Sequence, residues 1–124
     1  SFVISDIPYE ADFFDKKLSI ALQENFSYHK VVHKEYAGNI IDACKLSGTI
    51  ILRNRRDGDR IALAGRGFTS RLKVLFNEKV PLEERGRVAI LSDDKGIFYV
   101  EGFGVDERVK VDENTKSIII IAIS

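Results

Sequence analysis

The sequence predicts an α+β domain, mainly an antiparallel sheet or sandwich, with one helix in the middle of the chain and a short helical turn after it. Three observations support this prediction. Strand-like segments occur early and late in the chain, the one segment with helical spacing lies between them, and Gly and Asp turns separate them. The 124 residues are about the size of one domain, and neither a repeat nor a linker divides them.

The first half of the chain is predicted to be mostly strands. In residues 18–23, Leu and Ile alternate with small or polar residues, which is typical of a strand with one buried face. Residues 24–34 are polar without a clear period and are predicted to be an irregular connection. The other β-prone or Ile-rich segments are residues 2–7, 39–43 and 49–53, with a turn of the chain at residues 46–48.

The predicted helix follows two glycine-containing breaks, Asp57-Gly58-Asp59 and residues 65–67. Thr69 or Ser70 is expected to cap it, and Leu72, Leu75 and Phe76 recur at helical spacing through Lys79. Pro81 then begins a short helical turn over residues 82–85. The pattern is again that of strands at residues 88–91, 97–100, 108–111 and 117–123, with a hairpin turn at residues 93–96.

No arrangement of residues in the sequence indicates catalysis. A nucleophile needs a base within hydrogen-bond reach, and no pattern brings Cys44 to the two histidines, His29 and His33. We expect a buried, inert thiol and two solvated imidazoles. The histidines are four residues apart without a nearby third ligand, which argues against zinc, and no phosphate-cradling glycine motif occurs.

The net charge of zero conceals a basic middle. Residues 53–87 carry ten Lys or Arg and five Asp or Glu, whereas residues 1–52 have a balance of −2 and residues 88–124 a balance of −3. A locally positive face suits an anionic partner, although the net charge does not favour general attraction to nucleic acid. The candidate nucleic-acid contacts are Arg55, Arg56, Arg60, Arg66, Arg71, Lys73, Lys79 and Arg85.

Two interpretations of these cations stay open. Either the arginines pair with Asp57 and Asp59 to fix a turn, or they contact phosphate, because guanidinium serves both uses; this applies to Arg55, Arg56 and Arg60. Phosphate contact is favoured for Arg66, Arg71 and Lys73, which have no acidic neighbour in sequence and stand near an exposed helix start. The aromatic candidates for base stacking, which we expect to be core residues instead, are Phe68, Phe98, Tyr99 and Phe103.

Four motifs follow one another in the second half of the chain. They are the arginine-rich run of residues 52–61 with its Gly-Asp-Arg, the Arg-Leu-Lys helix of residues 71–81 running into Val-Pro, the Glu-Glu-Arg-Gly-Arg of residues 83–87, and the glycine turn of residues 102–108. In this order they resemble the C-terminal region of bacterial tRNA(Ile)-lysidine synthetases. The resemblance is specific from about Asp42 to the C-terminus. It departs where Gly65-Arg66-Gly67 replaces a glycine that two lysines often follow.

The resemblance implies a parent enzyme and a role within it. Such synthetases use ATP to activate the wobble cytidine of an isoleucine tRNA and then join lysine to it. That activity, with its ATP and magnesium, belongs to a catalytic domain whose Ser-Gly-Gly-x-Asp-Ser loop does not occur in this sequence. By the same resemblance the chain is a cytoplasmic, non-catalytic accessory domain without a cofactor of its own. It would bind tRNA(Ile), accompany its own catalytic domain and share its fold with part of a phenylalanyl-tRNA synthetase subunit.

The alternative is a structural or dimerisation module of the same enzyme whose arginines are paired internally. Unpaired cations on one exposed face would favour RNA, whereas salt-bridged arginines under an apolar patch would favour the module.

A membrane anchor is not expected, because the longest apolar run, residues 118–123, is too short to span a bilayer. The absence of Met further leads us to expect a fragment of a longer protein.

Overall fold

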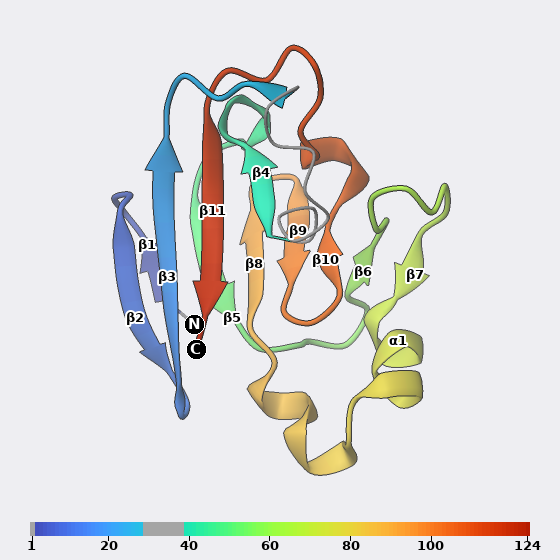
Figure 1. The fold of residues 1–124 in the computed structure, drawn as a ribbon. Helices are drawn as coiled ribbons and strands as arrows, with labels where there is room; N and C mark the ends of the chain where they lie inside the picture. The colour runs from blue at the N-terminus through green and yellow to red at the C-terminus, as the bar shows by residue number, and fades with distance from the viewer. Residues whose placement is uncertain (1, 29–38) are drawn as a thin grey trace.

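The computed structural model describes residues 2–28 and 39–124, and its strands form two antiparallel sheets and a short ribbon (Figure 1). The first sheet has the order β1 (Phe2–Ile4), β5 (Ile50–Arg53), β8 (Ile90–Asp93), β9 (Gly96–Val100) and β10 (Gly104–Val105). The second has the order β2 (Tyr9–Phe13), β3 (Lys16–Gln23), β11 (Ile118–Ile123) and β4 (Ile40–Asp42). The ribbon pairs β6 (Arg60–Ile61) with β7 (Ser70–Arg71).

The two sheets share one hydrophobic core, which confirms the predicted sandwich. Leu52, Leu91 and Phe98 of the first sheet belong to the same buried cluster as Leu18 and Ile121 of the second. Strand β11 pairs along its whole length with residues 18–23 of β3, and it also pairs with β4. Because strand residues alternate between faces, the predicted apolar alternation places Leu18 and Ile20 of β3 in this core, whereas Leu22, near the end of the strand, is 47% exposed.

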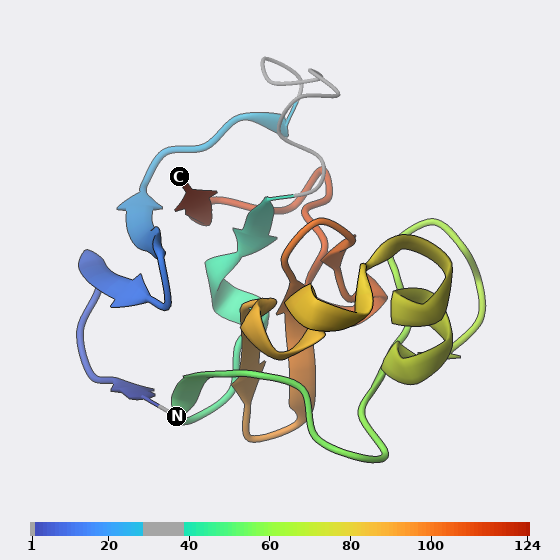
Figure 2. The ribbon, with the colours of Figure 1, turned by 90° about the horizontal axis from the view of Figure 1, so that it is seen from below.

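The central strands β8 and β9 of the first sheet are buried on both faces, because the helical part of the chain covers the side that faces away from the second sheet. Ile90 and Val100 point away from the shared core and pack with Leu72, Leu75 and Phe76 of α1 (Leu72–Lys79). α1 thus buries the stripe that its helical spacing predicts. Viewed from below, α1 and the following turn lie beside β8 and β9 (Figure 2). The described part of the chain also contains the 3₁₀ helices Ala43–Lys45, Leu82–Arg87 and Glu107–Val109.

One predicted strand is wrong. The sequence predicts β structure for residues 108–111, but the chain forms a 3₁₀ turn over Glu107–Val109 instead. Asp106 causes the turn, since its carboxylate accepts the backbone N–H of Arg108 at the N-cap. Val109 then points into the shared core with 0% exposure. Its alternation with charged neighbours resembles the pattern of a strand, although these residues do not pair with any described strand.

The two Ile-rich segments of the first half pair with different partners. β4 joins the second sheet and β5 the first, so the predicted turn at residues 46–48 carries the chain from one sheet to the other. Ser47 and Thr49 donate their backbone N–H groups to the carboxylates of Asp93 and Asp94 (2.9 and 3.0 Å). Gly48 has φ +74°, and a Cβ there would collide with the Asp94 carboxylate, so this crossing requires glycine.

The remaining predictions about elements are confirmed within a few residues or lie outside the described part of the chain. The hairpin at residues 93–96 joins β8 to β9, and Pro81 precedes the 3₁₀ helix Leu82–Arg87. Residues 24–28 contain no strand, and the rest of the irregular connection predicted at residues 24–34 is not described. Among the described residues, no helix is long and apolar enough to cross a membrane.

Candidate functional site

The arginine-rich turn after β5 is organised by Asp59. Arg53, at the end of β5, donates two guanidinium hydrogen bonds to its carboxylate (2.8 and 3.0 Å), and the Arg56 backbone N–H donates a third (2.7 Å). Both ion-pair side chains are only 10% exposed. Burial is the largest influence on Asp59 and opposes its ionisation, but the bonds from Arg53 and Arg56 together hold its pKa below the usual value.

The arginine-rich turn leads into the ribbon, and a backbone hydrogen bond connects the turn to the start of α1. Arg60 of β6 lies directly opposite Arg71 of β7, so the two guanidinium groups extend from the same face of the ribbon. The Leu72 N–H donates to the Asp59 carbonyl oxygen (3.0 Å). A fixed turn, a pair of arginines and a helix N-terminus therefore meet at one place.

A depression of about 410 Å³ lies at this meeting point. Its lining consists of four cations, two carboxylates and a glycine: Arg55, Arg60, Arg71, Lys73, Asp57, Asp59 and Gly58. Asp59 is already neutralised by Arg53, which is not part of the lining, and the exposed Asp57 lies 3.9 Å from Arg55. Within the described part of the chain, Arg60, Arg71 and Lys73 form no ion pair, so the depression has a net positive charge.

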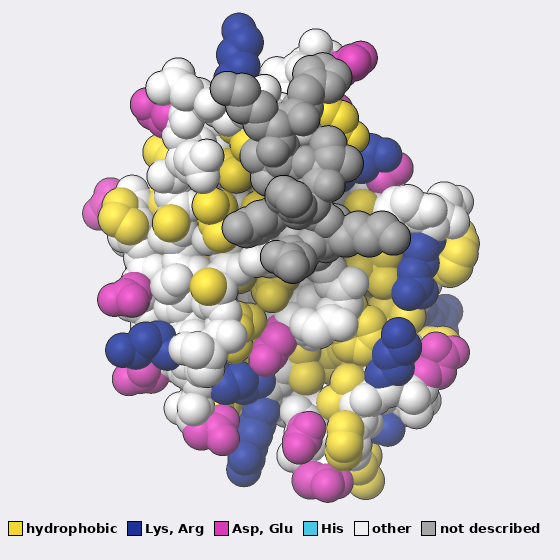
Figure 3. Space-filling model, viewed as in Figure 1, with side chains coloured by type: hydrophobic (Ala, Val, Ile, Leu, Met, Phe, Trp, Pro, Cys, Tyr) yellow, Lys and Arg dark blue, Asp and Glu magenta, His cyan; other side chains and the backbone are white. Residues whose placement is uncertain are grey.

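The basic side chains around this depression are open to solvent. Arg60, Arg71 and Lys73 are exposed. Figure 3 shows dark blue Lys and Arg side chains gathered along the side of the molecule formed by β6, β7 and α1. Like charges held opposite each other on a ribbon repel, and this repulsion is relieved when an anion binds between them.

The start of α1 adds to the same site but differs from the prediction. The sequence predicts a cap at Thr69 or Ser70, whereas the N-cap residue is Arg71 and no side chain caps the first turn. Ser70 instead pairs with Ile61 in the ribbon, and the Asp59 carbonyl takes the Leu72 N–H. The first turn is therefore left without a side-chain acceptor, an arrangement that favours an anionic ligand.

Four of the eight predicted contacts line the depression, namely Arg55, Arg60, Arg71 and Lys73, and the other four lie elsewhere. Arg56 is part of the turn but does not line the depression, and Arg66 is exposed in the loop between β6 and β7. Arg85 is tied to the end of α1, where it donates to the Val80 carbonyl (2.9 Å) and to the Asn77 side chain (2.6 Å). No sequence pattern distinguished Arg53 as the arginine that holds the turn, since its partner Asp59 is six residues away.

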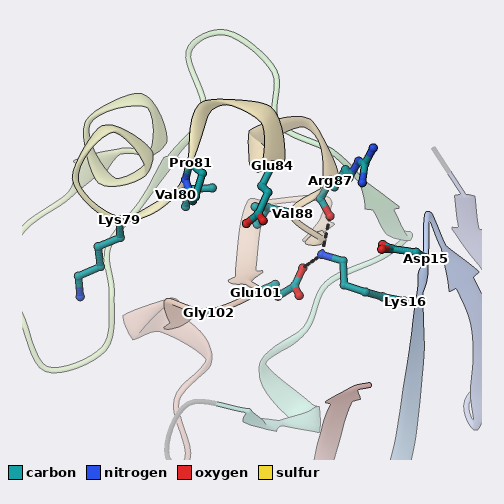
Figure 4. Close-up of a pocket in the computed structure, with 10 residues that line it drawn as sticks. All are labelled: Asp15, Lys16, Lys79, Val80, Pro81, Glu84, Arg87, Val88, Glu101 and Gly102. Carbon is teal, nitrogen blue, oxygen red and sulfur yellow. Dashed lines mark hydrogen bonds and ion pairs between the residues drawn. The ribbon is translucent and has the colours of Figure 1, made fainter.

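Lys79 lies beside a second depression of about 410 Å³, between the end of α1 and the β2–β3 hairpin (Figure 4). Its centre is a salt bridge in which Lys16 donates to Glu101 (2.6 Å) and to the Arg87 carbonyl (2.7 Å). The side chains of Lys79 and Arg87 point away from this pair in Figure 4. Acidic and basic groups are mixed here, so the pocket lacks the positive character of the first one.

Two of the four aromatic candidates are buried core residues, as expected, a third is partly buried against the core, and the fourth is exposed. Phe98 and Tyr99 are 1% and 6% exposed, and Phe103 stacks on Phe76 with ring centroids 5.6 Å apart. Phe68, in contrast, is 59% exposed in the loop between β6 and β7. The expectation that Phe68 belongs to the core is therefore wrong.

The residues considered for nucleophilic or metal chemistry do not form a site in the described structure. Cys44 is exposed in the 3₁₀ helix Ala43–Lys45, so the prediction of a buried thiol is wrong. Asp42 accepts the Cys44 backbone N–H (3.0 Å) and holds this short turn at the surface. His29 and His33 lie outside the described residues.

The sequence of this chain is similar to a known protein family and to several of its members. The family model described as the TilS substrate C-terminal domain matches residues 50–121. The tRNA(Ile)-lysidine synthase of Caldanaerobacter subterraneus subsp. tengcongensis is 38% identical over 81 residues, which cover 64% of this chain and 17% of that protein. The chain thus spans about a sixth of the length of the relatives it matches.

Two solved structures share the fold. A crystal structure of a TilS C-terminal domain superimposes with a TM-score of 0.78 at 25% identity, covering 94% of this chain and 90% of that one. An N-terminal fragment of the phenylalanyl-tRNA synthetase β-subunit from Pyrococcus horikoshii superimposes with a TM-score of 0.54 at 16% identity, covering 84% and 28%. The first match extends into residues 1–41, where the sequence motifs offered no specific resemblance.

Proposed function

Because the chain belongs to the TilS substrate C-terminal domain family, we propose that it is a tRNA-binding accessory domain of a tRNA(Ile)-lysidine synthase. In this proposal the domain holds phosphates of the substrate tRNA in the depression formed by the turn, the ribbon and the start of α1. The parent enzyme would be a cytoplasmic, ATP-dependent ligase that joins lysine to the wobble cytidine of tRNA(Ile). Its catalysis, with ATP and magnesium, would take place outside this chain, and the domain would orient the tRNA.

The observation that supports the proposal is a group of three cations around one depression, Arg60, Arg71 and Lys73, which form no ion pair with any described residue. Arg60 and Arg71 present two guanidinium forks from neighbouring strands, and each fork can bind two phosphate oxygens. Lys73 adds a charge from the first turn of α1. Contacts of this kind recognise the shape and the phosphate spacing of an RNA helix rather than its base sequence, which suits a domain that positions a large RNA.

The test is a titration of the domain with a tRNA(Ile) transcript at several salt concentrations. The variant Arg71→Ala/Lys73→Ala is compared with the wild type and with Lys17→Ala/Lys116→Ala, which removes the same charge from exposed positions outside the depression. Affinity of the wild type should fall with salt. The first variant should bind more weakly, with a salt dependence shallower by about one power of salt concentration for each phosphate that it no longer binds.

The affinities of the wild type and of the two double variants decide whether the depression binds phosphate. Weaker binding in the first variant alone supports the phosphate site. Equal affinity of both double variants, or no binding by the wild type at low salt, would refute it. A second, unrelated tRNA bound with equal affinity would place the discrimination between tRNAs elsewhere in the parent enzyme.

A packing surface is supported by a separate observation on the opposite side of the molecule. Phe2, Val3 and Phe14, at the edge strand β1 and beside β2, are 47%, 63% and 57% exposed. Figure 1 shows β1 and β2 on the side away from β6, β7 and α1. This surface suits contact with the catalytic domain or with a second copy, and it leaves the cationic depression free. Phe14→Ser should alter the oligomeric state, measured by sedimentation, if the second copy is the partner.

A further inference from the structure

Phe68 stands out from the other exposed apolar residues by its position inside a cationic loop. Single exposed apolar side chains are ordinary on protein surfaces, so the exposed area alone means little. Residues 65–69, between Leu63 and β7, are all exposed or partly exposed, and Phe68 follows Arg66 and precedes Arg71 along this stretch. An aromatic ring flanked by unpaired guanidinium groups is the chemistry that recognises a nucleotide, with a base on the ring and a phosphate on the cation.

The loop holds Phe68 away from the protein at a defined place. Its base is anchored, because the backbone N–H of Ala64 donates to the Val105 carbonyl (2.9 Å) and the backbone N–H of Arg66 donates to the Leu63 carbonyl (3.1 Å). Gly65 and Gly67 have φ of +85° and +75°, and a Cβ on either would meet nothing within 4 Å. The loop therefore turns sharply and stands in open space just before Phe68.

The charges near the loop leave Arg66 available for a phosphate. The acidic residue that contacts the loop is Glu107, whose carboxylate accepts the Gly65 N–H (3.4 Å). Glu107 is itself bound by Lys110 (2.6 Å), and this bond from Lys110 holds the Glu107 pKa below its usual value. Within the described part of the chain, the Arg66 guanidinium forms no ion pair, so its charge faces solvent together with the ring of Phe68.

The ring also lies within reach of the phosphate depression. Phe68 precedes Arg71 by three residues, and an extended chain covers at most about 10 Å over that span. A ligand with phosphates between Arg60 and Arg71 would pass the loop within a few nucleotides. Bases inside an RNA helix are already stacked on one another, so a protein ring can stack only on an unpaired base.

We propose that Phe68 stacks on an unpaired base of the bound RNA, with Arg66 on the adjoining phosphate, so that the domain recognises a junction between an RNA helix and a single strand. This inference rests on the proposed tRNA-binding function and adds the class of RNA structure that is bound. The helix occupies the depression of Arg60, Arg71 and Lys73, and the unpaired nucleotides cross the loop of residues 65–69.

The experiment compares two RNAs, a short blunt duplex and the same duplex extended at one end by a few unpaired nucleotides. The wild type should bind the extended RNA more tightly. Phe68→Ala should remove this preference, weakening the extended RNA about fivefold to a hundredfold, and should leave the blunt duplex unchanged. Phe68→Tyr should keep the preference because it keeps the ring. Leu82→Ala, which trims an apolar residue that is 77% exposed, is the matched control.

A fluorescent base analogue in the extension reports stacking directly. Its emission should be quenched by the wild type and by Phe68→Tyr, but not by Phe68→Ala. Equal affinity of the wild type for both RNAs, or an equal weakening for both in Phe68→Ala, would overturn the stacking role while the phosphate site stands. If Phe68→Ala binds both RNAs normally and instead weakens attachment of the domain to the rest of the full-length enzyme, Phe68 is a protein contact and the inference is wrong. Failure of the wild type to bind any RNA would refute the proposed function itself.

Discussion

The Arg53–Asp59 ion pair should be the main support of the candidate site, and Asp59→Asn tests this. The substitution keeps the shape of the side chain but removes its charge, leaving the Arg53 guanidinium without a carboxylate in a position that is 10% exposed. It weakens two guanidinium bonds and the bond from the Arg56 N–H. Hydrogen bonds to charged groups contribute about 1.5–3 kcal/mol each, and the Asn oxygen can still accept one. We expect the free energy of unfolding to fall by about 2–3 kcal/mol.

The measurement is urea unfolding of the wild type, Asp59→Asn and the control Asp57→Asn. Asp57 is fully exposed and lies 3.9 Å from Arg55, so its substitution should leave the free energy of unfolding nearly unchanged. A decrease in Asp59→Asn no larger than in Asp57→Asn would refute the supporting role of the pair.

The dependence on pH gives a second check with a definite sign. The Asp59 pKa is lower in the folded protein than in the unfolded chain, so its ionised form stabilises the fold above the unfolded pKa of about 3.9. This stabilisation is lost as pH falls through the folded pKa, and Asp59→Asn lacks it at every pH. The difference between wild type and variant should therefore be constant near neutral pH and shrink below about pH 4. A difference that does not change with pH would show that charge is not its cause.

Two further predictions concern α1 and the exposed thiol. Leu75→Ala should lower the free energy of unfolding by about 2–4 kcal/mol, because Leu75 is buried under the first sheet. Val74→Ala, at a position 50% exposed on the same helix, should lower it by less than about 0.5 kcal/mol. Urea unfolding measures both decreases, and equal decreases would contradict the assignment of the buried face of α1. Cys44 should react with a thiol reagent in the native protein, without unfolding, and labelling only at the rate of unfolding would contradict its exposure.

Elements with local signals could be predicted before any contact was known. Alternation predicted β3, helical spacing predicted the buried stripe of α1, and turn chemistry placed the breaks around Gly58 and the hairpin after β8. These predictions succeed because side-chain periodicity and backbone preference act between near neighbours in the chain. The basic middle and its four ordered motifs also indicated the family that the comparison then showed.

Which side chains are free depends on the packed fold and could be predicted only in part: the sequence favoured Arg66, Arg71 and Lys73 but left Arg60 open. Ten basic residues in residues 53–87 look alike in sequence, yet Arg53 is committed to Asp59 and Arg85 to the end of α1, while Arg60 and Arg71 face solvent. The fold also turned the residues after Asp106 into a capped 3₁₀ helix. The physical reason is the same in each case: several acceptors lie within a few residues of each long polar side chain, and the path of the folded backbone decides which of them lies in its neighbourhood. Spacing in the sequence carries no record of that neighbourhood.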